Sequence, residues 1–320
     1  MKMIITCDGS YVKDQEALDI IYEKYGYTSP SAERELICLA LSGNRAALRS
    51  YADLLFYRKI KCHSSYGKAF SLYLQAADVT LSANGGKCGG SGDPHAYFSI
   101  GYYLTNYKCE SVLKNCETID EIEAIDTDTR YELALDFALA SLDYCKSPAA
   151  INLIGRITGE RPSLLAKLEG NMSAEDYFEE AAEGGYVYAC NNLAAKEADL
   201  IVNGCEDVDE HINSFVHYLT ISADRLEPYA ANRLGLFYML GEIRSSDGRK
   251  EYFRDYINIP FAKKYFQKAI VYPDSNSAWA YFNLIKYFHK DYDTNLDLLN
   301  EHMECIRQLN PKVYDEAIEL

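Results

Sequence analysis

The stretch AEDYFEEAAEGGYVYACNNLA, residues 174–194, decides the fold of this chain. It contains two helix-forming segments separated by Gly184 and Gly185, and the second segment carries Ala189 and Ala194. Adjacent glycines are poor helix formers and good turn formers, so the chain reverses direction between the two segments. The stretch therefore predicts a helical hairpin with a short loop.

The helix that carries Ala189 and Ala194 recurs along the chain as the first helix of each repeat unit. Its pattern is an alanine, three residues, a large apolar residue and then a small residue. The copies are Ala47/Ala52, Ala96/Gly101, Ala150/Gly155, Ala189/Ala194, Ala230/Gly235 and, in degenerate form, Ala278/Asn283. A glycine inside a helix costs about 1 kcal/mol relative to alanine, so its recurrence at one equivalent position indicates a steric requirement. The repeated glycine therefore predicts a close helix crossing.

The second helix of each repeat unit alternates with this first helix along the chain. It carries an aromatic residue or leucine followed three positions later by a small residue. The copies are Tyr73/Ala76, Phe137/Ala140, Phe178/Ala181, Leu219/Ser222 and Phe266/Ala269. Helix pairs repeated in this way stack on one another and bury a continuous core. We therefore predict an all-α fold, an α-solenoid of helix-turn-helix repeats.

The repeats account for most of the chain. We expect an N-terminal helical cap at 1–42, an array of about six helix pairs at 43–290, a C-terminal capping helix at 291–320, and inserts at 78–93, 108–127 and 241–258. The first insert contains NGGKCGGSGD and is expected to be a flexible loop. The second is expected to hold an extra short helix, and the third is a charged connector. We expect one cooperative array rather than two domains.

The composition excludes several classes of partner. The chain has 320 residues, with 32 basic and 48 acidic side chains and a formal net charge of −16. Nucleic acids and anionic membranes are bound by clustered Lys and Arg, so neither is an expected partner. The sequence has neither a secretory signal nor a run near the roughly 18 apolar residues of a membrane span. The ten cysteines are irregularly spaced, which favours free thiols and a cytoplasmic location.

The segment at 174–194 and EPYAANRLGLFYMLGEI at 227–243 resemble Sel-one-like repeats, a branch of the tetratricopeptide superfamily. The resemblance weakens to a helix-pair pattern on either side of these segments. It implies a right-handed superhelix that acts as an adaptor for protein assemblies. The chain departs from the family because only Gly241 remains of the glycine-rich turn that follows each first helix.

In the tetratricopeptide arrangement that this resemblance implies, the first helices line a concave groove. The residues three before the second small position then point into the groove, namely Arg49, Phe98, Asn152, Asn191, Asn232 and Ala280. An amide both donates and accepts hydrogen bonds, so the three asparagines predict a ladder that pairs with the main chain of an extended peptide. The alternative is that these amides bridge neighbouring helices.

Two tyrosines and an arginine lie beside the ladder. Tyr188 and Tyr229 come six residues before the second small position, and Arg156 comes one residue after it. Tyrosine brings a large rigid contact area with a polar tip, which favours it at interfaces. We therefore expect the peptide-binding residues to be Asn152, Asn191, Asn232, Tyr188, Tyr229, Arg156, Phe98 and Arg49.

The glycine-rich insert raises the question of a metal site. Cys62, His63, Cys88 and His95 bracket it, although their spacing matches no compact zinc knuckle. The insert also departs from a phosphate-binding loop, because Lys87 is followed by cysteine rather than serine or threonine. We expect no catalytic centre and no cofactor.

These patterns favour a non-catalytic scaffold that binds an extended segment of a partner protein. One alternative is a metal-dependent enzyme or metal-binding protein with a site near residues 62–95. Another is a peptide-responsive regulatory protein. Self-association as a homodimer through the terminal helices is left open by the sequence.

Overall fold

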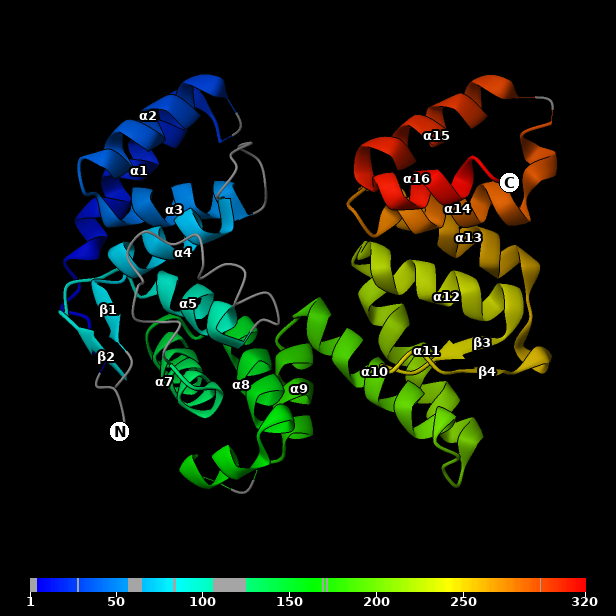
Figure 1. Cartoon of the computed structure of the whole chain (residues 1–320), viewed down its shortest axis with the longest axis horizontal. Coiled ribbons are helices and arrows are strands. Elements are labelled where there is room, and N and C mark those ends of the chain that lie inside the picture. Colours follow the sequence, from blue (N-terminus) through cyan, green and yellow to red (C-terminus); the bar gives the residue numbers. More distant parts are fainter. Residues whose placement is uncertain are drawn as a thin grey trace. The chain divides into compact units, whose positions relative to one another are not determined.

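The computed structural model describes residues 5–27, 29–56, 65–82, 85–105, 125–168, 170, 172–293 and 295–320. Over these residues the chain is mainly helical and forms two compact units (Figure 1). Unit 1 comprises residues Met1–Ala181, and unit 2 comprises residues Ala182–Leu320. The helical architecture confirms the all-α prediction, and the single cooperative array stays a prediction.

Unit 1 begins with the two helices expected at the N-terminus. They end at Tyr25 and Leu41, and they pack on each other and on the first repeat helix. The elements of unit 1 are α1 (Tyr11–Tyr25), α2 (Pro30–Leu41), α3 (Arg45–Phe56), α4 (Ser65–Ala76), β1 (Val79–Ser82), β2 (Gly85–Cys88), α5 (His95–Thr105), α7 (Thr127–Cys145), α8 (Pro148–Glu160), η2 (Pro162–Lys167) and most of α9 (Ala174–Glu183).

Unit 2 contains the repeats with the clearest sequence pattern. Several of its helices begin after a residue whose side chain caps the helix, such as Glu227 and Asn258, and these two caps are each followed within two residues by a proline. The elements of unit 2 are α10 (Val187–Val202), α11 (Val208–Asp224), α12 (Pro228–Leu240), β3 (Glu242–Arg244), β4 (Lys250–Tyr252), η3 (Arg254–Tyr256), α13 (Ile259–Ala269), α14 (Ser277–Tyr287), η4 (His289–Asp291), α15 (Leu296–Leu309) and α16 (Pro311–Ala317).

The most extensive helix contacts join a first helix to the second helix that follows it, as in α5 with α7 and α12 with α13. The glycines of the first helices lie at these contacts. A Cβ atom at Gly101 would lie 3.0 Å from a carbonyl oxygen of α7, and one at Gly155 would lie 2.8 Å from the ring of Phe178. At Gly235 the added atom would overlap the ring of Phe266. The predicted close crossing is confirmed. The small residue of the first-helix motif and the aromatic residue of the second-helix motif meet at this crossing.

The insert at 78–93 forms a β-hairpin, so the prediction of a flexible loop was wrong. β1 and β2 pair antiparallel, with Val79 opposite Cys88 and Leu81 opposite Gly86. The side chains of Val79 and Leu81 are buried, which anchors a segment that its glycines would otherwise leave without apolar support. Most of the insert at 108–127, including its expected short helix, lies outside the described residues.

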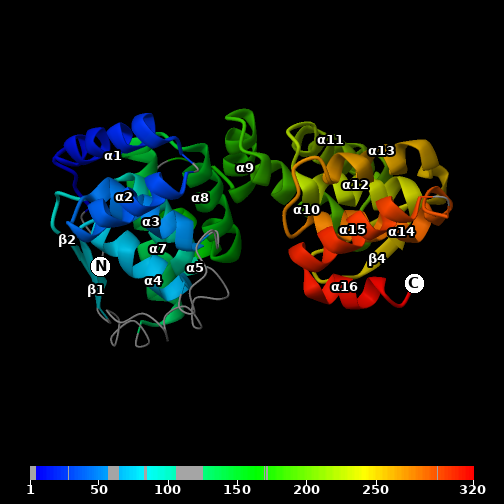
Figure 2. The same cartoon turned by 90° about the horizontal axis from the view of Figure 1, so that it is seen from above.

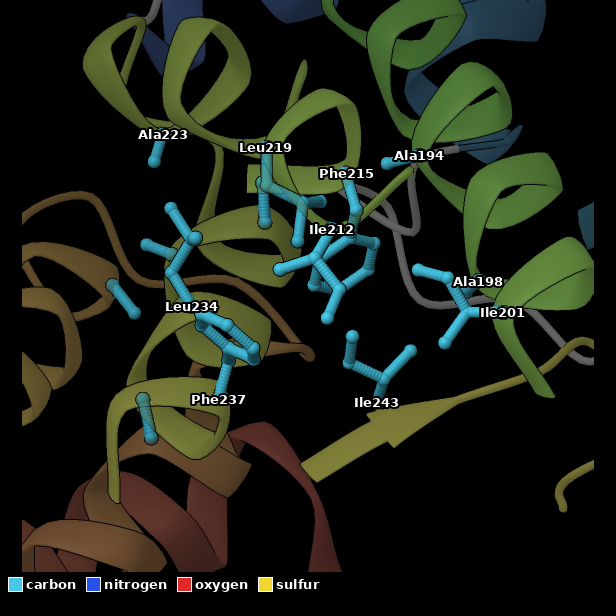
Figure 3. Packing of buried hydrophobic residues seen from close by; sticks show 14 residues of the cluster. Ala194, Ala198, Ile201, Ile212, Phe215, Leu219, Ala223, Leu234, Phe237 and Ile243 are labelled. Atoms are coloured by element: carbon cyan, nitrogen blue, oxygen red, sulfur yellow. The ribbon is translucent and has the colours of Figure 1, made fainter. Parts of the chain in front are cut away.

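The charged insert at 241–258 also forms a hairpin, which packs against α10 and α12. Gly241 ends α12 in the left-handed conformation with φ of 71°, where a Cβ atom would lie 2.9 Å from the main-chain nitrogen of Phe253. Ile243 of β3 is fully buried among α10, α11 and α12, near Ile201 and Phe237 (Figure 3). One apolar side chain thus anchors a segment whose composition predicts a solvated connector.

The C-terminal region holds two helices rather than the one predicted. α15 begins after Asn295, whose side chain accepts a hydrogen bond from Leu298 N, and it ends at Leu309 as expected. His302 of α15 is buried, and its Nδ1 lies 2.8 Å from the hydroxyl of Tyr292. α15 and α16 both pack against α14 (Figure 2), so the apolar face of α14 is covered within unit 2.

Candidate protein-binding faces

Two of the predicted binding residues in unit 1 meet at Tyr102. The ring of Phe98 on α5 lies 6.1 Å from the Tyr102 ring, and the Arg156 guanidinium on α8 lies 5.5 Å from the centre of that ring. Phe56 at the end of α3 packs edge-on against Tyr102 at 6.1 Å. A cation over an aromatic face is attracted by the ring quadrupole. We call these four partly exposed residues the unit 1 face.

Arg49 occupies a different setting. Its Nε donates a hydrogen bond of 2.8 Å to Asp93, and its Nη2 donates one of 3.0 Å to Gln15. Asp93 is fully buried, and it also accepts a hydrogen bond from His95 N at the start of α5. Arg49 therefore holds α1, α3 and the start of α5 together, and we leave it out of the unit 1 face.

The three asparagines at equivalent positions lie at contacts between helices. Asn152 is buried, with 6% of its surface exposed. Asn191 of α10 donates a hydrogen bond of 3.1 Å to Glu227, the residue that caps α12. Asn232 of α12 accepts a hydrogen bond of 3.0 Å from Asn283 of α14. In unit 2 the amides therefore bridge successive first helices, which is the alternative that the sequence left open.

This bridging uses only half of each amide in unit 2. The Oδ1 atom of Asn191 has no hydrogen-bond partner among the described residues. Asn232 engages its Oδ1, and no hydrogen bond from its Nδ2 is found in the described part of the chain. Bridging therefore leaves the Nδ2 of Asn232 for a ligand, whereas the unpaired Oδ1 of Asn191 is buried, and the peptide clamp stays a prediction.

The two predicted tyrosines are exposed at the beginning of successive first helices. Tyr188 on α10 has 53% of its surface exposed, and Tyr229 on α12 has 39%. Arg233, one turn after Tyr229, donates a hydrogen bond of 3.1 Å to the Tyr229 hydroxyl. We call Tyr188, Asn191, Tyr229, Asn232 and Arg233 the unit 2 face.

The hairpin of β3 and β4 packs on the other half of the same two helices. Asp199, near the end of α10, accepts hydrogen bonds of 2.6 and 2.8 Å from the main-chain nitrogen and hydroxyl of Ser246. Arg249 donates a hydrogen bond of 2.7 Å to Asn203. The hairpin therefore covers the end of α10 that lies away from Tyr188, and it limits the unit 2 face on that side.

A buried carboxylate holds the hairpin in shape. Glu242 is 6% exposed and accepts hydrogen bonds from Lys250 at 2.8 Å and Arg244 at 2.9 Å. Burial alone would raise the pKa of Glu242, but these two hydrogen bonds outweigh it and hold the pKa below its usual value. Glu242 thus stays ionised at neutral pH and ties β3 to β4.

The alternative metal site falls partly outside the described residues, because Cys62 and His63 belong to the segment at 57–64. Cys88 donates a long hydrogen bond of 3.5 Å to Thr6 O, and the ring of His95 packs edge-on against Tyr11. In the described part of the chain, no three His, Cys, Asp or Glu side chains gather as metal ligands do.

Three residues of these faces, Phe56, Tyr102 and Arg233, escape the sequence analysis, as does the helix cap Glu227. Tyr102 comes one residue after Gly101, the same relative position as Arg156, so the repeat alignment contains the signal that would find it. Glu227 and Arg233 act through partners on other elements, which a linear pattern does not reveal. Among the helices that the structure describes, none combines the length and apolar character needed to cross a lipid bilayer.

Solved structures with a similar architecture identify the fold. A Sel1 repeat protein from Oxalobacter formigenes is similar over 92% of this chain and 98% of its own, with a TM-score of 0.50 and 17% identity. The chain has the Sel-one-like repeat fold. This finding confirms the resemblance that the repeats at 174–194 and 227–243 predict.

Two further solved structures are similar. One is the immunity protein Pa5087 from Pseudomonas aeruginosa, with 16% identity, a TM-score of 0.49, and coverage of 85% of this chain and 83% of the other. The second is c5321, a protective antigen of uropathogenic Escherichia coli strains with an SLR fold, with 15% identity, a TM-score of 0.48, and coverage of 97% and 59%. No protein-family model and no curated protein matches the chain.

Proposed function

We propose that this chain is a non-catalytic interaction scaffold that holds a segment of a partner protein on the unit 2 face. The observation that carries the proposal is the pair of exposed tyrosines, Tyr188 and Tyr229, at equivalent positions of successive repeats. An exposed tyrosine adds a large contact area at little entropic cost, because only two side-chain torsions need to be fixed.

The amide side chains of Asn191 and Asn232 supply the polar contacts with the partner segment. Asn232 offers an Nδ2 donor that is not used within the described chain, and Asn191 has an unpaired Oδ1 acceptor that is buried and reaches a partner only when its side chain turns outward. An extended main chain presents N–H and C=O groups in alternation, so it satisfies both. The partner segment is therefore recognised largely through its backbone, with its apolar side chains placed against the tyrosines.

The unit 1 face provides a second contact of different chemistry. Phe98, Tyr102 and Arg156 combine two aromatic rings with a cation that is 28% exposed. Such a surface favours aromatic or acidic side chains of a partner. A partner that reaches both faces gains affinity from the tethering of the two contacts.

The test is affinity capture from a lysate of the source cell, quantified by mass spectrometry. It compares the unaltered chain, the Tyr188→Ala/Tyr229→Ala variant and a Tyr272→Ala control. Tyr272 is 67% exposed and follows α13, so its loss removes an equally accessible ring from outside the unit 2 face.

We expect at least one protein to be retained by the unaltered chain and the control and lost from the double variant. Purified partner then allows titration against Asn191→Ala and Asn232→Ala, each expected to weaken binding by about tenfold for one lost hydrogen bond. If all three forms retain the same proteins, the unit 2 face is not the binding site.

A further inference from the structure

The hairpin of unit 2 presents one edge that the chain does not use. Ile243 lies opposite Glu251, and two residues further along the ladder Ser245 N donates a hydrogen bond of 2.9 Å to Arg249 O. Hydrogen-bonded pairs alternate with non-hydrogen-bonded pairs in an antiparallel ladder, so Ile243 and Glu251 form a hydrogen-bonded pair. The main-chain groups of the residues on either side of Glu251 therefore point away from β3.

Those residues are Lys250 and Tyr252. In the described part of the chain, no hydrogen bond uses the main-chain N–H or C=O of either one. All three residues of β4 are exposed, and Tyr252 has 53% of its surface accessible. β4 lies on the far side of β3 from α12 (Figure 1), whereas β3 faces α12 through Arg244 O, which accepts a hydrogen bond of 2.6 Å from Arg233.

The hairpin of unit 1, formed by β1 and β2, has a neighbouring segment of the chain. Just beyond β2, Gly90 O accepts a hydrogen bond of 2.8 Å from Asp8 N, and Thr6 O lies 3.5 Å from the Cys88 sulfur. The N-terminal segment therefore runs beside that hairpin. Exposed strand edges are templates for pairing with another chain, and all three residues of β4 lie exposed on such an edge.

The open edge is also rigid. The ion pairs of Glu242 and the hydrogen bonds of Ser246 and Arg249 to α10 fix the hairpin before any ligand arrives. A preformed edge loses little conformational freedom when a strand is added, which lowers the cost of binding.

A second copy of this chain fits the edge of β4 poorly. If two β4 strands pair antiparallel about a two-fold axis at Lys250, the two copies of Lys250 lie opposite each other. If the axis lies at Glu251, the two copies of Glu251 lie opposite each other. Like charges directly opposite each other destabilise a strand pair, so both of these registers are disfavoured. Pairing centred on Tyr252 brings Lys250 of one copy toward Arg254 of the other, a residue of like charge that begins η3 beyond the strand.

We propose that the edge of β4 binds an extended segment of a partner protein as a third strand. Its main chain pairs with Lys250 and Tyr252, an aromatic or aliphatic side chain packs on Tyr252, and an acidic side chain faces the exposed Arg254. This site is separate from the unit 2 face and stands whether or not that face binds a partner.

The probe is a displayed library of random linear peptides, selected on the full chain and counter-selected on Tyr252→Pro. Proline removes the outward N–H of residue 252 and keeps the hydrogen bonds between β3 and β4, because this N–H is not in that ladder. Tyr252→Ala is the matched control, since it removes the ring and keeps the N–H. Trp279 fluorescence checks that both variants are folded.

We expect enriched peptides to bind Tyr252→Pro at least about tenfold more weakly than Tyr252→Ala, a difference of about 1.4 kcal/mol. N-methylation along the peptide should abolish binding at every second residue, as a strand with one paired edge requires. The proposal is overturned if no peptide is enriched, if both variants bind equally, or if N-methylation shows no two-residue period. It is also overturned if the unaltered chain forms a dimer that Tyr252→Pro dissociates, since a second copy then occupies the edge.

Discussion

Replacement of Gly235 by alanine tests the repeat contact most directly. In an unconstrained helix this change stabilises by about 1 kcal/mol, because alanine has the higher helix propensity. In α12 the new methyl group would lie 3.0 Å from Cγ of Phe266 and closer still to two other ring atoms. Phe266 is fully buried, so its ring cannot move without displacing its neighbours. Overpacking costs about 1–3 kcal/mol, and the depth of this overlap favours the upper end, so we expect a net loss of about 2 kcal/mol.

The chain offers a selective reporter for this measurement. Its single tryptophan, Trp279, lies in unit 2, so tryptophan fluorescence during urea titration reports the free energy of unfolding of that unit. Gly159 in α8 is the control, because a Cβ atom there would lie 3.6 Å from its nearest neighbour, an ordinary contact. We expect Gly159→Ala to stabilise unit 1 by up to about 1 kcal/mol, measured by far-UV circular dichroism.

A third variant tests whether overpacking against the Phe266 ring causes the loss in stability. Phe266→Leu removes the planar ring that the new methyl group would meet. If overpacking is the cause, Gly235→Ala should cost less in that background, and the two changes should couple by about 1 kcal/mol. The reasoning is refuted if Gly235→Ala is as stable as the unaltered chain, or if the two changes are additive.

Three further predictions concern buried charges. Arg49→Met leaves the fully buried Asp93 without its cation, and we expect it to destabilise unit 1 by about 3 kcal/mol in urea titrations followed by circular dichroism. Glu242→Gln should cost about 1–2 kcal/mol, since its two basic partners retain access to water, and hydrogen exchange should show faster opening of the hairpin. Burial lowers the pKa of His302, so the unfolded chain binds this proton more readily than the folded one. The stability of unit 2 should therefore fall as pH drops through the unfolded value of about 6.5, and His302→Gln should remove that slope in Trp279 fluorescence titrations; an unchanged slope would contradict the assignment.

The helix pairs were predictable because their packing repeats at fixed spacing. Gly101, Gly155 and Gly235 are costly inside a helix, so their recurrence signals a steric requirement. The structure supplies its cause, which is a carbonyl oxygen of α7 at Gly101 and an aromatic ring at Gly155 and Gly235. The hairpins were not predictable from composition. Each is anchored by one or two apolar residues, such as Ile243, whose burial depends on helices distant in sequence.

The repeat alignment finds equivalent positions in the candidate site but not the partners of their side chains. It singles out Asn191 and Asn232, which lie at contacts between first helices, the alternative that the sequence left open. It does not reveal Glu227, because a helix cap that also binds the preceding repeat depends on how the two helices cross. The partner of Arg49 was hidden for a similar reason, since the fully buried Asp93 ends an insert that the repeat pattern does not cover.

The contact between Gly235 and Phe266 joins α12 to α13, and the contact between Gly155 and Phe178 joins α8 to α9, so each stays inside one first-helix and second-helix pair. The unit that evolution or an engineer can duplicate, delete or exchange without breaking such a contact therefore begins with a first helix and ends with the next second helix. The short Arg225–Glu227 connection before α12 is a natural junction for splicing. A cut placed between α12 and α13 would separate a glycine from its ring and leave both sides of the splice mismatched.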